Sequence, residues 1–315
     1  MRYDGTRIPS SVGASIVTDE VQQAMQFQDL LKTESGRTPY LFGEMFEDGG
    51  FMARLRSRRR FKLLKRIDEE LLRILDDGEQ VHFLTKGAEF SSSWFSFGVF
   101  LDLFVSKCQL VVTNRRLLVV DIPSGDHSLR RGYQVCLSAI LGVARGYNRI
   151  NVVSQNGDSH YICDFPNGDV NALVEILDDL RGGQRTEAGG DAGAESLCPH
   201  CCRPVEGNPA ACPQCQGAFK PVRKAMILSL ICPGLGSLFL GYRAAGLIEM
   251  IAHVVVWTPL FLCVLLLGTG LDNVGYAMAL FFFVVVMATA HGWRWLWFRA
   301  FHKDRLYAAG HEGAL

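Results

Sequence analysis

Apolar positions change their spacing along the chain, and the changes predict a sequence of different elements. Residues 1–50 are mixed and polar, and we expect much of this segment to be poorly ordered. Between residues 51 and 77 apolar side chains recur every three or four residues, with Leu64, Ile67 and Leu71 among them. That spacing predicts an amphipathic helix.

From residue 78 the pattern changes to short runs of β-branched and leucine residues, which are typical of strands. The runs 109–113 and 116–120 flank a polar turn and predict a hairpin. Asn156-Gly157 marks a second tight turn. Further strands are expected at 81–86, 133–137, 149–153 and 160–165, and a closing amphipathic helix at 169–180.

This region resembles the bacterial PH-like family. The resemblance rests on Gly78-Glu79, on the sequence Val112-Thr-Asn-Arg-Arg-Leu-Leu-Val119 and on the closing helix, and it covers residues 78–181. It implies a PH-like β-barrel with a C-terminal helix that captures a protein segment or a lipid head group. The Phe-rich run 94–105 departs from the pattern and is either a buried strand or a loop that touches a membrane.

The first half of the helix expected at 51–77 is strongly basic, and residues 54–66 contain no acid. Basic side chains near an anionic lipid surface gain about 1 kcal/mol each. On this interpretation the lipid-facing residues are Arg56, Arg59, Arg60 and Lys62. The alternative is a solvated helix face that pairs with the acids at 68–70.

Two Cys-x-x-Cys pairs form the most specific signal in the chain: Cys198, Cys201, Cys212 and Cys215. Ten residues (202–211) separate the pairs, enough for a hairpin that closes a four-thiolate structural zinc site. Iron could use the same ligands, and a mobile disulfide is a weaker alternative. Four protein ligands leave no open position, so the zinc ion would stabilise the fold and not catalyse.

The segment 197–219 resembles the small zinc ribbons found near membrane segments in bacterial proteins. In that family a glycine usually follows the second cysteine of each pair, whereas this chain has Cys202 and Gln216. Cys202 could also serve as a spare ligand. The Gly- and Ala-rich residues 182–196 predict a flexible linker before the ribbon. Reduced thiolates indicate a reducing compartment, so these soluble modules should face the cytoplasm.

Three apolar stretches follow, at 225–241, 245–267 and 274–290, within a membrane region of residues 225–300. Pro233-Gly-Leu-Gly236 breaks the first, which resembles the start of a widespread two-helix transmembrane family. Basic residues precede the first stretch and follow the third, while residues 268–273 carry none. Basic residues favour the cytoplasmic side, so we expect two spans in the inner membrane with both termini cytoplasmic. Trp293, Trp295 and Trp297 would form an interfacial belt.

The sequence thus predicts a multidomain α+β membrane protein: a PH-like β-barrel, a short zinc ribbon and a two-span α-helical membrane region. It contains no phosphate-binding glycine loop, nucleophile elbow or His-Glu metal motif, so no enzyme is indicated. Equal numbers of basic and acidic residues, 32 each, indicate no nucleic-acid partner. We expect a non-enzymatic scaffold that binds anionic lipid or a protein.

A different interpretation of the same chain is a small transporter or channel subunit with cytoplasmic regulatory domains. Glu249 and His253 lie one helical turn apart near the start of the second stretch and could form a proton or ion site. Two spans per chain would then require a homo-oligomer. The alternative for this pair is an interfacial position or a helix-packing hydrogen bond.

Overall fold

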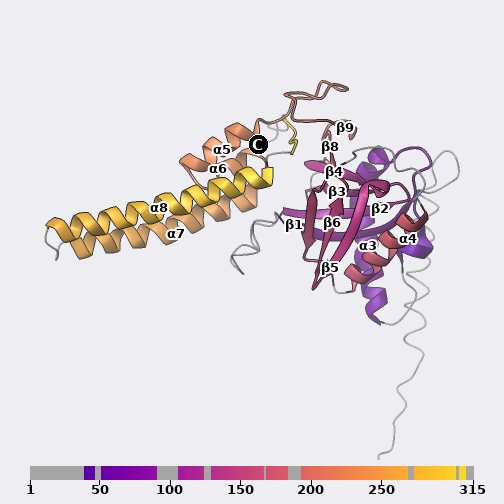
Figure 1. Cartoon of the computed structure of the whole chain (residues 1–315), viewed down its shortest axis with the longest axis horizontal. Coiled ribbons are helices and arrows are strands. Elements are labelled where there is room, and N and C mark those ends of the chain that lie inside the picture. Colours follow the sequence, from indigo (N-terminus) through magenta and orange to yellow (C-terminus); the bar gives the residue numbers. More distant parts are fainter. Residues whose placement is uncertain are drawn as a thin grey trace, which may run out of the picture.

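The computed structural model describes residues 39–46, 51–90, 106–123, 129–166, 168–183, 193–268, 273–302 and 305–309. Within these ranges a β-rich body lies at one end of the molecule and a long helical hairpin extends from it (Figure 1). The cysteine-containing segment lies beside the junction of the two. The predicted Phe-rich run 94–105 and residues 1–38 lie outside the described residues.

The body is built on an antiparallel sheet in the order β5-β6-β7-β1-β2-β3-β4, which two further strands extend beyond β4. A short 3-10 turn, η3 (Leu137–Ala139), joins β4 to β5. β5 was not predicted, because its glycines, its arginine and its half-exposed run interrupt the apolar pattern. The strand bounds are β1 (Val81–Phe90), β2 (Ser106–Thr113), β3 (Arg116–Asp121), β4 (Arg131–Cys136), β5 (Ile140–Gly146), β6 (Arg149–Ser154) and β7 (Ser159–Cys163).

Two hydrophobic cores lie on the two faces of this sheet. The inner core contains Phe83, Leu110 and Val119, and α4 (Asp169–Gly183) closes it with Leu173 and Leu177. The predicted antiparallel sheet with a closing C-terminal helix is therefore present.

The outer core lies between the sheet and α3 (Phe51–Ile74), which covers it with Leu64, Ile67 and Leu71. The apolar face of α3 is thus buried against the sheet of the body. The short helix α2 (Phe42–Met45) adds Met45 to the same core, beside Tyr40. Residues 39–46 therefore differ from the poorly ordered segment expected for the N-terminal region.

The residues of the PH-like sequence pattern form one buried hydrogen-bond network. Arg116 donates to Glu79 through Nε (2.9 Å) and Nη2 (2.6 Å), and the Thr113 hydroxyl donates to the same carboxylate (2.6 Å). Burial alone would raise the pKa of Glu79, but these hydrogen bonds outweigh it and lower that pKa. Gly78, just before Glu79, adopts a positive φ of 74° that favours glycine. The pattern therefore has a structural role.

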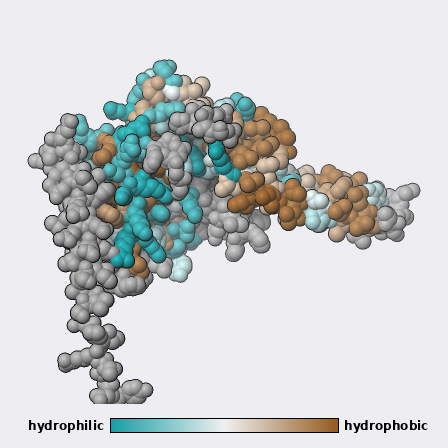
Figure 2. Space-filling view, turned by 180° about the vertical axis from the view of Figure 1, so that it is seen from behind, coloured by the Kyte–Doolittle hydropathy of each residue, from teal (hydrophilic) through white to brown (hydrophobic). Residues whose placement is uncertain are grey.

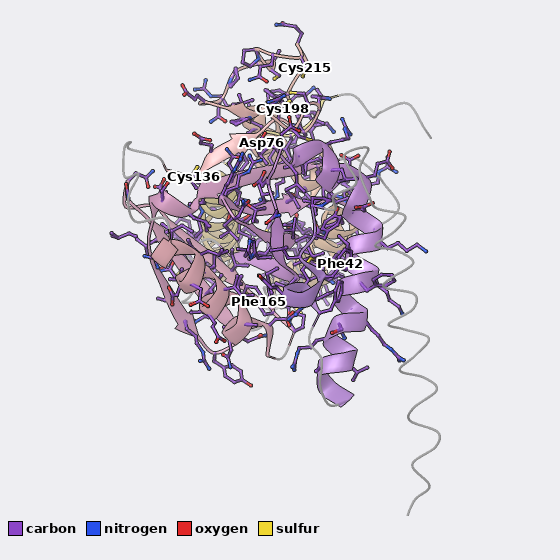
Figure 3. All side chains as sticks on the ribbon, turned by 90° about the vertical axis from the view of Figure 1, so that its right-hand side faces the viewer. Phe42, Asp76, Cys136, Phe165, Cys198 and Cys215 are labelled. Atoms are coloured by element: carbon purple, nitrogen blue, oxygen red, sulfur yellow. The ribbon has the colours of Figure 1, made fainter. Side chains whose placement is uncertain are left out.

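The ribbon segment is joined directly to the body. Its first strand, β8 (Glu195–Leu197), pairs with β4, and β9 (Pro204–Val205) pairs with β8. The linker expected at 182–196 therefore ends before Glu195. In Figure 3 Cys198 and Cys215 lie beyond the end of the body marked by Asp76, opposite Phe165.

The hairpin consists of α7 (Arg243–Gly268) and α8 (Asn273–His302), with α5 (Val222–Ile231) and α6 (Leu235–Phe239) at its base. Only one described helix, Gly246–Leu266 in α7, is long and apolar enough to cross a membrane. Val274–Thr289 in α8 is apolar but shorter, so the two predicted spans are not both shown. Figure 2 shows the apolar surface of the hairpin in brown. The side chains of Trp293, Trp295 and Trp297 lie outside the described residues.

Candidate metal centre

The structure brings the four predicted cysteines together at one point. The sulfur atoms of Cys198, Cys201, Cys212 and Cys215 all lie within 4.8 Å of one another. Across the two pairs, Cys198 Sγ is 3.7 Å from Cys215 Sγ, and Cys201 Sγ is 3.7 Å from Cys212 Sγ. A tetrahedral zinc ion with Zn–S bonds of about 2.3 Å has sulfurs about 3.8 Å apart. The cluster can therefore hold a metal ion and is compatible with zinc.

Both Cys-x-x-Cys loops have the same backbone geometry. The residue after each second cysteine, Cys202 or Gln216, adopts a left-handed φ of 60°. Its N–H donates to the carbonyl of the first cysteine, at 2.8 Å for Cys202 and Cys198, and 2.9 Å for Gln216 and Cys212. This is the conformation for which glycine is usual, and a non-glycine residue costs about 1–2 kcal/mol there. The missing glycines therefore do not change the geometry of the site.

Backbone N–H groups favour the thiolate form of Cys212. Burial works to raise the pKa of the Cys212 thiol, but N–H groups of Cys215 and Gln214 point at its sulfur and lower the pKa to about 7. Burial raises the pKa of Cys198 and Cys201, whose thiolates would need a cation beside them. A metal cation at the site would supply the positive charge that these thiolates need.

Two neighbours of the cluster are not part of it. Cys202 is buried in the outer core with Leu197, so the prediction of a spare ligand is wrong. His200 lies between the first two cysteines, but its ring stacks on Phe219 with centroids 6.4 Å apart. Arg73 of α3 donates to the His200 carbonyl at 3.0 Å, which adds a contact between ribbon and body.

The ribbon also binds the segment that follows the hairpin, which we call the tail (residues 305–309). Phe219 forms a β-bridge with Ala308. The Lys220 N–H donates to the Tyr307 carbonyl at 2.8 Å, and the Ala309 N–H donates to the Ala218 carbonyl at 2.9 Å. Leu306 of the tail completes the small ribbon core, which includes Cys198 and Cys212.

The tail reaches the body as well. Arg305 donates to the buried carboxylate of Glu89 at the end of β1, at 2.5 Å from Nη1 to Oε2. Arg131 of β4 donates to the same carboxylate at 3.1 Å. Sequence reasoning missed these residues. The only sequence signal for the tail was the apolar Leu306-Tyr307 pair after the basic end of the last helix.

The predicted lipid-facing residues have different surroundings. Arg59 and Lys62 are exposed and Arg56 is half-buried. Arg60 is 2% exposed, so its assignment as lipid-facing is wrong. Its guanidinium pairs with Asp169 at 2.7 Å and lies 4.4 Å from the ring centroid of Phe83. Arg60 therefore ties α3 to the start of α4.

The ionisable pair in the hairpin lies where α6 meets α7. Glu249 is 5% exposed and accepts a hydrogen bond of 3.1 Å from the Ser237 hydroxyl of α6. The ring of His253 lies 6.1 Å from that of Trp257. The Glu249 contact fits the helix-packing interpretation of this pair.

The solved structures to which the chain is similar share little sequence with it. No protein-family model matches the chain, and no curated protein matches it closely. Among solved structures, the C-terminal domain of an unknown protein from Leishmania infantum aligns at 13% identity, covering 38% of this chain and 95% of that one (TM-score 0.26). The N-terminal PH domain of human ARAP2 aligns at 16% identity, covering 38% and 93% (TM-score 0.24).

Proposed function

We infer that this chain is a membrane-anchored, non-enzymatic adaptor, in which a zinc ribbon fixes a PH-like binding domain to a helical membrane anchor. The observation that carries the proposal is the position of the ribbon. It shares β8 with the sheet of the body and a β-bridge with the tail that follows the hairpin. A rigid joint between a binding module and an anchor is what an adaptor needs in order to present its partner at a set position.

Zinc would act as the fold-determining element of this joint. A structural zinc ion contributes apparent free energies of about 10–16 kcal/mol to small cysteine modules. Besides cysteines, the ribbon's own core contains only Val205, Phe219 and the tail's Leu306 among the described residues. So small a core is insufficient without a metal, disulfides or a partner. Metal loading would therefore determine whether body and anchor are held together.

The anchor is proposed to be the α7–α8 hairpin. Exposed apolar side chains run along both helices, including Val255 and Leu262 of α7 and Phe281 of α8. On a soluble protein such a surface would lead to aggregation, whereas lipid tails accommodate it. Ribbon, tail and body gather at one end of the hairpin, which supports both termini on one side of the membrane. Thiolate chemistry and the flanking basic residues favour the cytoplasmic side.

The PH-like body is proposed to bind a protein and not the lipid of its own membrane. Figure 2 shows hydrophilic side chains gathered over the part of the body that α3 covers, while the hairpin runs across the view. A bilayer crossed by this hairpin would lie perpendicular to it. The hydrophilic surface therefore points parallel to the membrane plane and not toward the lipid. Since α3 also buries its apolar face, it has no apolar side to insert between lipids.

Insertion of the hairpin can be tested with two matched arginine substitutions. Val255 in α7 is 63% exposed, and Leu141 on β5 is 65% exposed. An arginine near the middle of a span costs roughly 2.5–3.5 kcal/mol of insertion free energy, whereas an arginine on the solvent face of the body costs little. Val255→Arg should therefore release the full-length chain from membranes upon alkaline extraction, and Leu141→Arg should not.

Proteoliposomes of the wild-type chain give the second part of the test. A protease added outside should cleave body and tail from the same side. If body and tail were protected on opposite sides, or if both arginine variants stayed in the membrane, the proposed anchor would be wrong.

A further inference from the structure

A group of cations that the sequence does not place together meets on the outer face of the body. Arg59, Lys62 and Arg66 follow one another along α3 at helical spacing. Lys86 of β1 and Lys107 of β2 lie on the neighbouring sheet surface. We call these five side chains the basic surface.

Strand register explains why the two lysines lie together. Lys86 pairs directly with Gln109, and Lys107 lies two residues before Gln109 on the same face of β2. Diagonal neighbours of this kind are about 7–8 Å apart, within reach of long side chains. The same face of β1 carries Leu84, which packs under α3. The lysines thus emerge beside the helix that carries the arginines.

Four of the five charges on this surface have no ion-pair partner among the described residues. Arg59, Lys62, Lys86 and Lys107 form no ion pair with any residue in the part of the chain that the structure describes. Burial lowers the pKa of Lys86, and the positive charges of Arg66, Lys107 and Arg59 lower it further. Like charges held this close destabilise the folded body slightly, and an anionic ligand would remove that cost.

We propose that α3, β1 and β2 together form a docking surface for an acidic segment of a soluble partner protein, an inference that rests on the adaptor role above. The cations lie along a helix and the strands beside it, so a linear polyanion could contact the whole group. An acidic polypeptide is favoured over a bilayer because the surface faces along the membrane plane. It is favoured over nucleic acid because the phenylalanines whose burial is described on these three elements, Phe61 and Phe83, are half-buried and buried and so are not available for base stacking.

The test uses the full-length chain in nanodiscs of neutral lipid, with fluorescent poly-glutamate as the probe. The variant Lys86→Gln/Lys107→Gln removes two charges from the surface. The control Arg115→Gln/Arg145→Gln removes two exposed charges elsewhere on the body, so both variants have the same net charge. We expect wild type and control to bind alike, and the lysine variant to bind roughly three- to tenfold more weakly. Binding should fade as salt rises.

Equal affinities for both variants would overturn the docking surface. An oligonucleotide or anionic vesicles that bind more tightly than poly-glutamate, with the same dependence on Lys86 and Lys107, would overturn the acidic-protein partner. Membrane insertion, read separately with Val255→Arg, keeps the two proposals distinguishable. If only poly-glutamate binding fails, the docking surface is wrong and the anchor stands.

Discussion

Loss of the metal centre should release the tail from the ribbon while leaving the body folded. The perturbation is Cys212→Ser/Cys215→Ser, which removes two of the four thiolates and with them the tetrahedral site. The purified wild-type chain should contain about one zinc ion per chain, and the double variant should contain none.

The magnitude follows from the contacts of the tail. Its two backbone hydrogen bonds to the ribbon, at 2.8 and 2.9 Å, are each worth about 1 kcal/mol. Burial of Leu306 in the ribbon core adds about 2 kcal/mol. Losing about 4 kcal/mol of opening free energy corresponds to roughly a thousandfold faster amide exchange.

Hydrogen exchange on the full-length chain in detergent measures this directly. The reporters are the amides of Ala309 and Lys220, which donate the two hydrogen bonds between tail and ribbon. Amides of β2 and β3 should keep their protection, because the inner core holds both strands without the ribbon. Cys202→Ala is the matched control, since this cysteine lies next to the site but packs in the outer core.

Unchanged protection at Ala309 after metal loss would refute this reasoning. It would mean that contacts outside the ribbon hold the tail, namely the Arg305–Glu89 ion pair and the packing of Tyr307 against Ala225 and Leu240. The ribbon would then not couple body and anchor. Equal metal loss in Cys202→Ala would contradict the assignment of the four ligands.

Three further outcomes are expected. Glu79→Gln leaves the buried Arg116 without its main anionic partner. It should lower the free energy of unfolding, read from amide exchange in β2 and β3, by about 3–5 kcal/mol. The control Asp178→Asn, which breaks an exposed i,i+3 ion pair, should lower it by less than about 0.5 kcal/mol. Because hydrogen bonds lower the pKa of Glu79 below its unfolded value of about 4.5, its stabilisation is present above pH 4.5 and is lost as pH falls through the folded pKa. The protection factors, which are exchange rates corrected for the pH dependence of intrinsic exchange, should therefore fall on acidification more steeply in the wild type than in Glu79→Gln, and equal slopes would contradict this. Gly234 has a φ of +93°, and Gly234→Ala would place a Cβ 2.2 Å from the Gly246 carbonyl oxygen. The substitution should destabilise the α6–α7 contact by about 2 kcal/mol or more, which would appear as a lower thermal midpoint in detergent. The control Gly292→Ala has open space around its Cβ and should leave the midpoint unchanged.

Features that depend on a few consecutive residues could be predicted from the sequence. Each cysteine loop is local, so the spacing of Cys198, Cys201, Cys212 and Cys215 was enough to indicate a four-sulfur cluster. The strands of the body were predicted for the same reason, since β-branched runs and turns are short-range signals. β5 was missed because its half-exposed, glycine-containing run lacks that signal.

Features that depend on residues far apart in the chain could not be predicted from the sequence. Arg59 and Arg60 are neighbours in one basic run, yet one is exposed and the other pairs with Asp169 in a different helix. Lys86 and Lys107 join Arg59 only because α3 crosses the outer face of β1 and β2.

The sequence by itself determined that this chain has a strand-rich region, a four-cysteine module and an apolar C-terminal region, because period, spacing and hydropathy are properties of short segments. Only the tertiary structure decided that the cysteine module joins the sheet through β8 and the tail through the bridge between Phe219 and Ala308. Backbone pairing between remote segments leaves no mark in either segment's composition. Such pairing depends on which strand edges and charged side chains the rest of the fold brings close together.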